Sequence, residues 1–177
     1  YTIPFLPAGD YNVTAAITGF QTQTVDRLTL QVQQTARMDF KLSVGSINEK
    51  VTVAASADVL QTENATVGTV IDSGKIVQLP LNGRNYSDLA LLATNVHRSP
   101  IAAQPTTPRE GAFNVNGLRS TYNNFLLDGV DNNAYSTSNQ GFSNQVANPS
   151  PDAVAEFKVI TSNFSAEYGR VGGAVVN

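Results

Sequence analysis

Two short apolar runs, each closed by a glycine turn, most constrain what this chain can fold into. Residues 113–117 alternate Phe and Val with Asn and end in Gly, and residues 125–129 hold a continuous apolar run that ends in Asp-Gly. Alternation with a period of two indicates a half-buried strand, and a continuous run indicates a strand covered on both faces. The connector, residues 119–123, is too short for a crossover helix. The stretch therefore predicts a pair of strands that carry polar loops.

Residues 1 to about 55 show strand patterns without helical periodicity. The expected strands, separated by Gly and Pro turns, are residues 1–5, 11–17, 21–25, 28–32 and 36–42. In the last of these, Met38, Phe40 and Leu42 fall on one face and charged residues on the other. Short strands at regular spacing predict a β-sandwich. Because about fifty residues make a marginal core alone, and both chain ends read as strand interiors, we expect a piece of a longer polypeptide.

The composition excludes several classes of site and partner. The 177 residues contain no cysteine and one histidine, His97, which excludes disulfides, thiolate metal sites and multi-histidine metal sites. A formal net charge of −3 argues against a nucleic-acid partner, which usually requires a basic face. Only 14% of the residues are charged, while Asn, Ser, Thr and Gln are plentiful. This balance favours an envelope protein or surfaces packed against other protein.

Beyond a polar linker at residues 56–64, the pattern changes to strands mixed with short helices. Asp72-Ser73 supplies helix-capping oxygens, so a helix is expected from there to Gln78. The other expected helices are residues 85–93 and 153–156, and the expected strands are residues 66–71, 157–161 and 173–177. Residues 95–111 and 132–148 lack any apolar period and are expected as loops.

One group of oxygen-bearing side chains raises the question of bound calcium. Asp128, Asp131 and Asp152, with Asn132 and Asn133 nearby, offer the hard oxygen ligands that Ca²⁺ prefers. Their spacing does not follow the helix-loop-helix calcium pattern, and Asp-Gly is commonly just a turn. The sequence therefore favours no metal site, with calcium as the alternative.

Two further residue pairs resemble catalytic groups. Glu156 and Glu167 are a conceivable carboxylate pair for glycoside hydrolysis, but nothing in the sequence places them across a cleft. His97 beside Arg98, at the start of a loop, is more typical of solvated surface than of a catalytic pair. We therefore expect no catalytic residue, no cofactor and no enzymatic activity.

The stretch Glu49-Lys50-Val51-Thr52-Val53-Ala54-Ala55 has two interpretations. It is either the last edge strand of the sandwich or a short exposed strand that pairs with the sheet edge of a partner. In the second case backbone hydrogen bonds supply affinity and alternate side chains supply specificity. The residues by themselves leave both interpretations open.

The N-terminal motifs resemble those of the carboxypeptidase-regulatory-like (transthyretin-like) sandwich domain. They are the Leu-Pro-Ala-Gly-Asp-Tyr run at residues 6–11, Gly19-Phe20, and the strand that leads into residues 42–45. The resemblance covers only the later strands of that domain. It implies a structural role, in which the Pro-Ala-Gly turn and the aromatic rings of Tyr11 and Phe20 help to build a core.

A series of motifs occurs in a fixed order after residue 65. They are Leu-Pro-Leu-Asn-Gly-Arg-Asn at 79–85, Val-Asn-Gly-Leu-Arg at 115–119, Asn-Asn-Phe-Leu-Leu-Asp-Gly at 123–129, Ala-Glu-Phe-Lys-Val at 155–159, Glu-Tyr-Gly-Arg at 167–170 and Gly-Gly-Ala-Val-Val-Asn at 172–177. This order resembles the plug domain of TonB-dependent outer-membrane transporters, in the Oar-like subgroup with an N-terminal carboxypeptidase-regulatory-like domain. Many plugs carry Arg before the Gly of the second motif, where this chain has Asn116. A plug-to-barrel salt bridge of that arginine is therefore not carried over, and Arg119 is its possible substitute.

The resemblance implies an architecture and a set of partners. The fold class is mainly β, with a partial transthyretin-like sandwich (1–55), a linker (56–64) and a small α+β plug with a mixed sheet and short helices (65–177). The two strands at residues 113–117 and 125–129 then belong to the central sheet of the plug, either paired with each other or separated by later strands from Phe157 and Gly173. The implied partners are the periplasmic C-terminal domain of TonB, the chain's own transmembrane β-barrel and an imported substrate. The implied location is the bacterial outer membrane, with the plug inside the barrel and the N-terminal domain in the periplasm.

The same resemblance assigns roles to named residues. Glu49, Lys50, Val51, Thr52, Val53 and Ala54 form a TonB-box candidate, the segment that TonB binds. Arg84, Arg119, Glu156 and Arg170 are candidates for ion pairs within the plug or with the barrel. Tyr135, Asn139 and Phe142 belong to a polar loop that is the candidate for substrate contact.

The alternative function is a non-catalytic, β-rich binding or adhesion module of the bacterial cell envelope. The sandwich is then a spacer rather than a periplasmic appendage. The two functions predict different sequences after Asn177, since a transporter requires several hundred further residues of alternating strands there.

Overall fold

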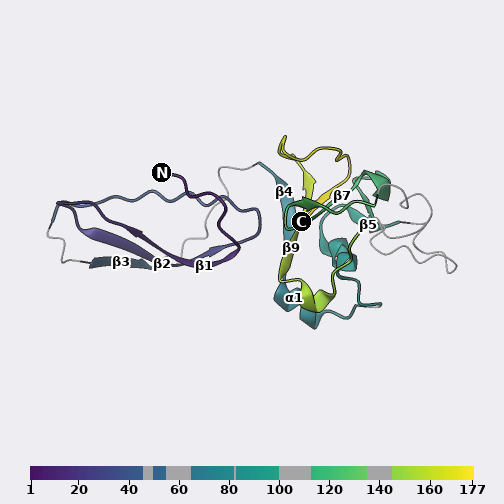
Figure 1. Ribbon diagram of the computed structural model, residues 1–177, viewed down its shortest axis with the longest axis horizontal. Coiled ribbons are helices and arrows are strands. Elements are labelled where there is room, and N and C mark those ends of the chain that lie inside the picture. Colours follow the sequence, from purple (N-terminus) through teal and green to yellow (C-terminus); the bar gives the residue numbers. More distant parts are fainter. Residues whose placement is uncertain (46–49, 55–64, 82, 100–112, 135–144) are drawn as a thin grey trace. The chain divides into compact units, whose positions relative to one another are not determined.

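The chain folds into two compact units, Tyr1–Ala65 and Thr66–Asn177, in the computed structural model shown in Figure 1. The structure describes residues 1–45, 50–54, 65–81, 83–99, 113–134 and 145–177, and for residues 50–54 it describes the backbone alone. Within these residues no helix combines the length and apolar character needed to cross a membrane. The structure is mostly strand with few helices, which confirms the mainly β class.

The first unit contains a three-stranded sheet in the order β1-β2-β3. Its strands are β1 (Gly9–Ala15), β2 (Thr22–Leu30) and β3 (Lys50–Ala54). β1 runs antiparallel to β2, whereas β3 runs parallel to it. Residues 31–45 run back along the sheet between the end of β2 and its start, where Phe20 forms a bridge with Val44 (Figure 1).

β2 replaces the two separate strands that were expected at residues 21–25 and 28–32. The register between β1 and β2 shifts at Tyr11/Val13, and Arg27 adopts a left-handed φ of 58°. The Asn12 side chain accepts the Arg27 backbone N–H at 3.0 Å, which stabilises this bulge. The bulge lets Val25 and Leu28, three residues apart, both be buried. That spacing breaks the two-residue period and looks like a strand boundary in the sequence.

Two other strands expected in this unit are not formed in the described chain. Residues 1–5 are all exposed and belong to no strand, so the predicted strand Tyr1–Phe5 is wrong. Residues 36–42 alternate between half-buried and exposed as predicted, but they join no ladder. A strand requires a neighbour for its backbone hydrogen bonds, and the alternating pattern alone does not supply one.

The second unit is built on a five-stranded mixed sheet in the order β4-β9-β10-β7-β8. Its strands are β4 (Val67–Asp72), β7 (Asn124–Leu127), β8 (Val130–Asp131), β9 (Glu156–Ser162) and β10 (Val175–Val176). All neighbours are antiparallel except β10 and β7, which are parallel. β10, which comes last in the sequence, therefore occupies the middle of the sheet.

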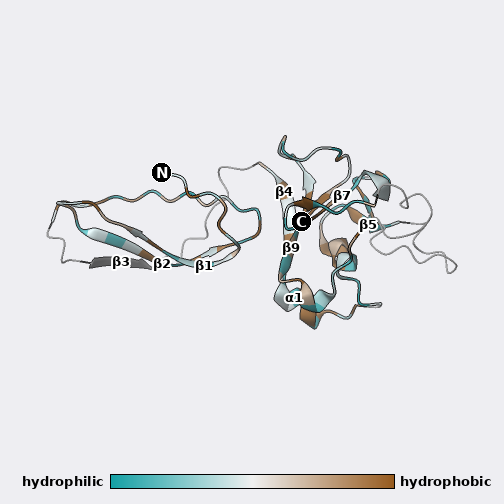
Figure 2. Cartoon of the chain, in the orientation of Figure 1, coloured by the Kyte–Doolittle hydropathy of each residue, from teal (hydrophilic) through white to brown (hydrophobic). Residues whose placement is uncertain are grey.

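One face of this sheet carries the hydrophobic core. The elements that contribute core residues over this face are α1 (Ser73–Gln78), η1 (Tyr86–Leu92), β5 (Val96–Arg98) and β6 (Phe113–Val115). Two short 3₁₀ helices, η3 (Ser120–Tyr122) and η5 (Pro151–Ala153), complete the unit. Ile71, Phe157, Val159, Val176 and Phe125 come from the sheet, and they join Ile76, Leu89 and Val115 in one buried cluster. Hydrophobic segments are visible on α1 and beside the C-terminus in Figure 2.

Capping side chains begin the helical elements of the second unit, and most of these elements are 3₁₀ turns. The Asp72 side chain accepts the Lys75 N–H at 3.0 Å and caps α1, which ends at Gln78 as expected. Asn85 caps η1, the 3₁₀ form of the helix expected at residues 85–93. The helix expected at 153–156 is instead η5, which begins at Pro151, because Ser150 supplies the cap oxygen. Glu156 already belongs to β9.

The strand pair at residues 113–131 is divided between two sheets. β6 pairs with β5 rather than with β7, so Val96–Arg98 is a strand and its prediction as loop is wrong. β7 lies in the central sheet between β10 and β8, and the prediction that β6 also lies there is wrong. Asn116-Gly117 and Asp128-Gly129 both have positive φ, as tight type I′ turns require. The two strands still touch, since the Phe113 and Phe125 rings meet edge-on at 5.9 Å.

Candidate functional site

Asparagine side chains of the second unit form hydrogen bonds that hold segments between strands against the central sheet. The best defined of these ties joins the two ends of the segment between Ala134 and Gln145. Asn132 is only 4% exposed; its Nδ2 donates to the Ala147 carbonyl and its Oδ1 accepts the Ala147 N–H, both at 2.8 Å. The Val146 N–H donates to the Asn132 carbonyl at 2.9 Å, and Asn133 forms a bridge with Gln145. We call Asn132, Asn133, Gln145 and Ala147 the neck.

Tyr86 connects the neck to the hydrophobic core. Its hydroxyl donates to Gln145 Oε1 at 2.6 Å, and its ring meets the Phe157 ring edge-on at 5.3 Å. Burial raises the pKa of Tyr86 to about 12, although the hydrogen bond from its hydroxyl to Gln145 acts in the opposite direction. The tyrosine is therefore neutral at physiological pH, and it connects Gln145 of the neck to Phe157 of β9.

Asn133 fixes the strand β7 that precedes the neck. Its Oδ1 accepts the Phe125 N–H at 2.9 Å, and its Nδ2 donates to the Phe125 carbonyl at 3.2 Å and to Asn124 Oδ1 at 2.8 Å. Asp131 accepts the Asn133 N–H and Nδ2 at 2.9 and 2.7 Å. The Asp131 carboxylate is therefore engaged in a local turn.

Asn123 holds the last strand of the chain in place. Its Nδ2 donates to the Phe113 carbonyl at 2.8 Å, while its Oδ1 accepts the Ala174 N–H at 3.1 Å. The N–H groups of Gly172 and Gly173 both donate to the Tyr122 carbonyl. A Cβ atom at Gly173 would lie 2.2 Å from Asn123 Oδ1, so only glycine fits beside this amide. The amide thus links β6 to the segment that enters β10.

The substrate-contact candidates Tyr135, Asn139 and Phe142 lie outside the described residues. The structure nevertheless describes both ends of their segment, which the neck brings together. The neck residues were not predicted, because Asn132 to Asn148 reads as one low-complexity loop. The signal present in the sequence is the pair Asn132-Asn133, which directly follows a strand and its Asp-Gly turn.

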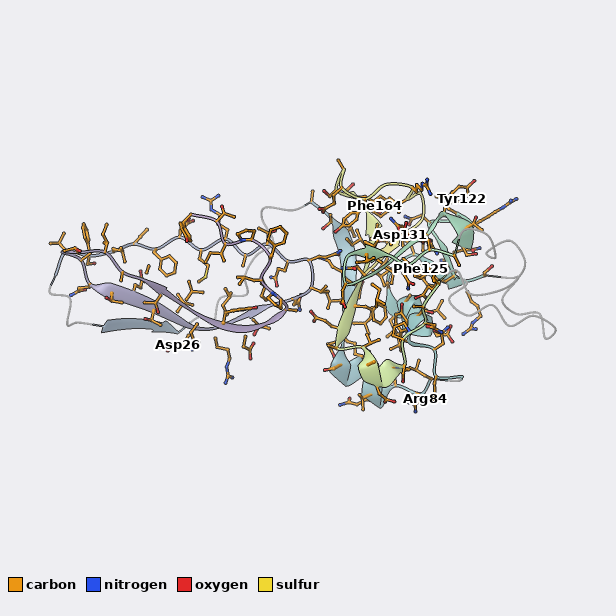
Figure 3. All side chains as sticks on the ribbon, viewed as in Figure 1. Asp26, Arg84, Tyr122, Phe125, Asp131 and Phe164 are labelled. Carbon is orange, nitrogen blue, oxygen red and sulfur yellow. The ribbon has the colours of Figure 1, made fainter. Side chains whose placement is uncertain are left out.

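The four ion-pair candidates lie on separate elements. Arg84, exposed on the turn after α1, pairs with Asp152 of η5 at 2.5 Å (Figure 3). Arg119 is exposed at the start of η3 and makes no ion pair among the described residues. Glu156 begins β9 opposite Asp72, and exposed Arg170 has a left-handed φ of 55°. The pair between Arg84 and Asp152 joins the turn after α1 to η5.

The residues considered as catalytic or metal-binding candidates lie on an exposed strand, in a turn and in ion pairs. His97 is exposed on β5 opposite Asn114, and Arg98 lies 4.0 Å from Asp88. Asp128 forms the β7-β8 turn, whereas Asp152 pairs with Arg84. Among the described residues no three His, Asp or Glu side chains gather closely enough to hold a metal ion.

The TonB-box candidate lies in the first unit. Glu49 is outside the described residues, and Lys50–Ala54 forms β3, the edge of the three-stranded sheet. Its register with β2 runs from Thr22↔Lys50 to Asp26↔Ala54. Both interpretations of this stretch involve an edge strand, and they differ in whether a partner uses the edge.

Both parts of the chain match known protein families. Residues 1–43 match the carboxypeptidase regulatory-like domain, and residues 60–176 match the TonB-dependent receptor plug domain. The TonB-dependent transporter Oar of Myxococcus xanthus is 23% identical over 185 residues, which cover 100% of this chain and 16% of Oar. The crystal structure of the outer membrane transporter YddB from Escherichia coli superposes with a TM-score of 0.50 at 22% identity, over 62% of this chain and 16% of that one. The chain thus spans about a sixth of the length of these relatives.

Proposed function

Because the chain belongs to the TonB-dependent receptor plug domain family, we propose that it is the plug and periplasmic N-terminal region of an outer-membrane transporter. The observation that carries the proposal is the family match at residues 60–176, which spans nearly the whole second unit. The plug closes the lumen of the chain's own β-barrel and gates energy-coupled uptake of a substrate. It acts without catalysis, as the transporter relatives suggest.

We also propose a division into domains, which the matches at residues 1–43 and 60–176 support. Residues 1–55 form the end of a carboxypeptidase-regulatory-like domain in the periplasm, residues 56–64 are a linker, and residues 65–177 form the plug. Residues 49–54 are the TonB box, bound by the periplasmic C-terminal domain of TonB. Support comes from the position of this segment between the two matched families and from its formation of an edge strand.

The neck holds together the two ends of the segment that we assign to substrate contact. Residues Tyr135, Asn139 and Phe142 belong to a segment whose two ends are clamped by paired amide hydrogen bonds to Asn132. These bonds involve uncharged groups, as suits a plug inside a water-filled lumen. The segment faces the outside of the cell, where substrate arrives, and movement of the core reaches it through Tyr86.

Charged surface groups place the plug against the barrel wall. Arg119, exposed and without an ion pair in the described chain, is the strongest candidate for a salt bridge to the barrel. Arg84 is already paired with Asp152 and acts within the plug. We also assign Glu156 and Arg170 to ion pairs within the plug or with the barrel.

Cysteine labelling on intact cells tests this orientation, because the chain has no cysteine of its own. Val146 beside the neck is 75% exposed, and Thr29 on β2 is also exposed. In the transporter that contains this chain, made free of other cysteines, a membrane-impermeant maleimide labels Val146→Cys from outside. It labels Thr29→Cys only after the outer membrane is permeabilised. An adhesion module would be labelled at both positions in intact cells, and this result would contradict the proposal.

A further inference from the structure

The short strand β10 joins two parts of the central sheet in the second unit. Within the described residues β9 pairs with β4 and β10, whereas β7 pairs with β10 and β8. Val176 of β10 is registered with Val159 of β9 on one side and with Phe125 of β7 on the other. If the sheet opens in its middle, it therefore opens on one side of β10 or on the other.

Hydrogen bonds to β7 and its flanking turns hold both ends of β10. At the beginning, the Ala174 N–H donates to Asn123 Oδ1 at 3.1 Å, and the Asn124 N–H donates to the Ala174 carbonyl at 2.7 Å. At the end, Asn177 Oδ1 accepts the Gly129 N–H of the β7-β8 turn at 2.8 Å. β10 is therefore fixed to the β7 side by bonds that lie outside its two-residue ladder.

β9 pairs with β4 over a longer boundary than with β10. Its register with β4 runs along the whole of that strand, Val67–Asp72, whereas its register with β10 covers Val175–Val176. Lys158 of β9 and Asn177 exchange two backbone hydrogen bonds beyond this register, at 2.7 and 3.1 Å. The ladder between β9 and β10 is thus the short one, and it lacks the side-chain bonds that fix β10 to β7.

Other contacts of β9 lead to the elements over the core. Asn116 Nδ2 donates to the Thr161 carbonyl at 2.7 Å, and the Tyr86 ring meets the Phe157 ring edge-on at 5.3 Å. These contacts must also break if β9 leaves β10. Such an opening is therefore an infrequent, sub-global event of a closed unit.

We propose that the second unit parts along a seam between β9 and β10, so that β4 and β9 separate together while β10 remains on β7. β4 is the first strand after the proposed linker, so a pull through that linker reaches the β4-β9 pair first. This inference rests on the proposed function, in which the plug gates a lumen. It adds the line along which the plug opens.

Two neighbouring amides of β9 report on the two boundaries separately. The Lys158 N–H donates to the Asn177 carbonyl on the β10 side. Because amides alternate in direction along a strand with antiparallel neighbours on both sides, the Val159 N–H faces β4. Native-state hydrogen exchange of the 177-residue chain, followed by NMR, measures both. The seam predicts that Lys158 exchanges at least tenfold faster than Val159 after correction for their intrinsic rates.

Two disulfide staples that share one cysteine test the boundaries directly. Val159 is registered with Val176 of β10 and with Thr69 of β4, and the chain has no cysteine of its own. Registered partners lie within the Cα separation that a disulfide spans. Oxidation of Val159→Cys/Val176→Cys should slow exchange of the Lys158 amide at least tenfold relative to the reduced variant. Oxidation of the matched Val159→Cys/Thr69→Cys variant should change it by less than about threefold.

Three results would overturn the proposal. Faster exchange at Val159 than at Lys158, or slowing of Lys158 by the Thr69 staple alone, would place the parting line between β4 and β9. Equal protection of both amides in the unaltered chain would show that the sheet opens as one body. Absence of protection at both would show that β10 does not lock the sheet.

The exchange experiment is separable from the test of the proposed function. Labelling of Val146→Cys in intact cells decides whether the chain is a plug, and it is independent of where the sheet parts. If labelling succeeds and the exchange pattern fails, the plug stands and the seam is wrong. If labelling fails and the exchange pattern holds, the seam is a property of the fold without the gating role.

Discussion

Replacing Asn132 by alanine tests whether the neck is a defined structural closure. The substitution removes two 2.8 Å hydrogen bonds that join the Asn132 side chain to both backbone groups of Ala147. A typical net contribution is about 1 kcal/mol for each such bond. Because Ala147 is exposed, water replaces part of the loss, and the expected cost of the substitution is about 2 kcal/mol at most.

Hydrogen exchange at the Ala147 amide is the appropriate assay. Two-state analysis of global unfolding is not suited to a chain of two units, whereas hydrogen exchange reports the local opening of one segment. A cost of about 2 kcal/mol corresponds to a roughly thirtyfold faster exchange of the Ala147 and Val146 amides. Amides of β9 should change little, since their hydrogen bonds lie within the sheet.

Two further variants sharpen the test. Asn132→Asp keeps the acceptor for the Ala147 N–H but sets a buried carboxylate against the Ala147 carbonyl and Gln145 Oε1. It should therefore open the neck at least as much as alanine at pH 7, and less at low pH where the carboxyl is protonated. Thr121→Ala, at an exposed position outside the neck, is the control. Unchanged exchange at Ala147 in Asn132→Ala would refute the reasoning.

Three other predictions concern the core, the last strand and the surface. Burial raises the pKa of Tyr86 to about 12, and the resulting contribution to stability is complete below about pH 10. This contribution, up to about 3 kcal/mol, is lost as the pH rises toward 12. Tyr86→Phe should flatten that part of a pH titration of stability, and an unaltered profile would contradict the prediction. Gly173→Ala should cost about 1–3 kcal/mol, because its Cβ meets Asn123. Hydrogen exchange of the β9 amides measures this cost in the second unit, and Gly169→Ala, where a Cβ has open space, is the control. Arg84→Ala should change the stability of the second unit by less than about 1 kcal/mol, since the pair with Asp152 is exposed. A larger loss, measured by hydrogen exchange of the β9 amides, would show a structural role beyond this pair.

Much of the architecture of the second unit was predictable, because local signals determine it. Asp72 and Asn85 begin helical turns through their own side chains, and the two X-Gly turns have the positive φ that those residues favour. The family resemblance, confirmed by the match at residues 60–176, rests on the same turns and on the order of the apolar runs. Local chemistry does not determine which strand pairs with which.

The errors arise where pairing and side-chain contacts are non-local. β5 has three residues and becomes a strand only because β6 lies beside it, and its sequence, Val-His-Arg, has no strand pattern. β10 inserts between β9 and β7 because Asn123 and the close approach at Gly173 admit it there. The neck was missed because an asparagine that binds backbone across fifteen residues looks, in sequence, like any loop asparagine.

The central claim is that residues 65–177 close a barrel, and ion conductance through the purified transporter in a planar lipid bilayer tests it most directly. The account predicts that the complete transporter shows almost no conductance, and that deletion of residues 65–177 produces large, stable channels. Deletion of residues 1–45 alone should leave the pore closed, because the closure lies in the second unit. Equal conductance with and without residues 65–177 would contradict the account.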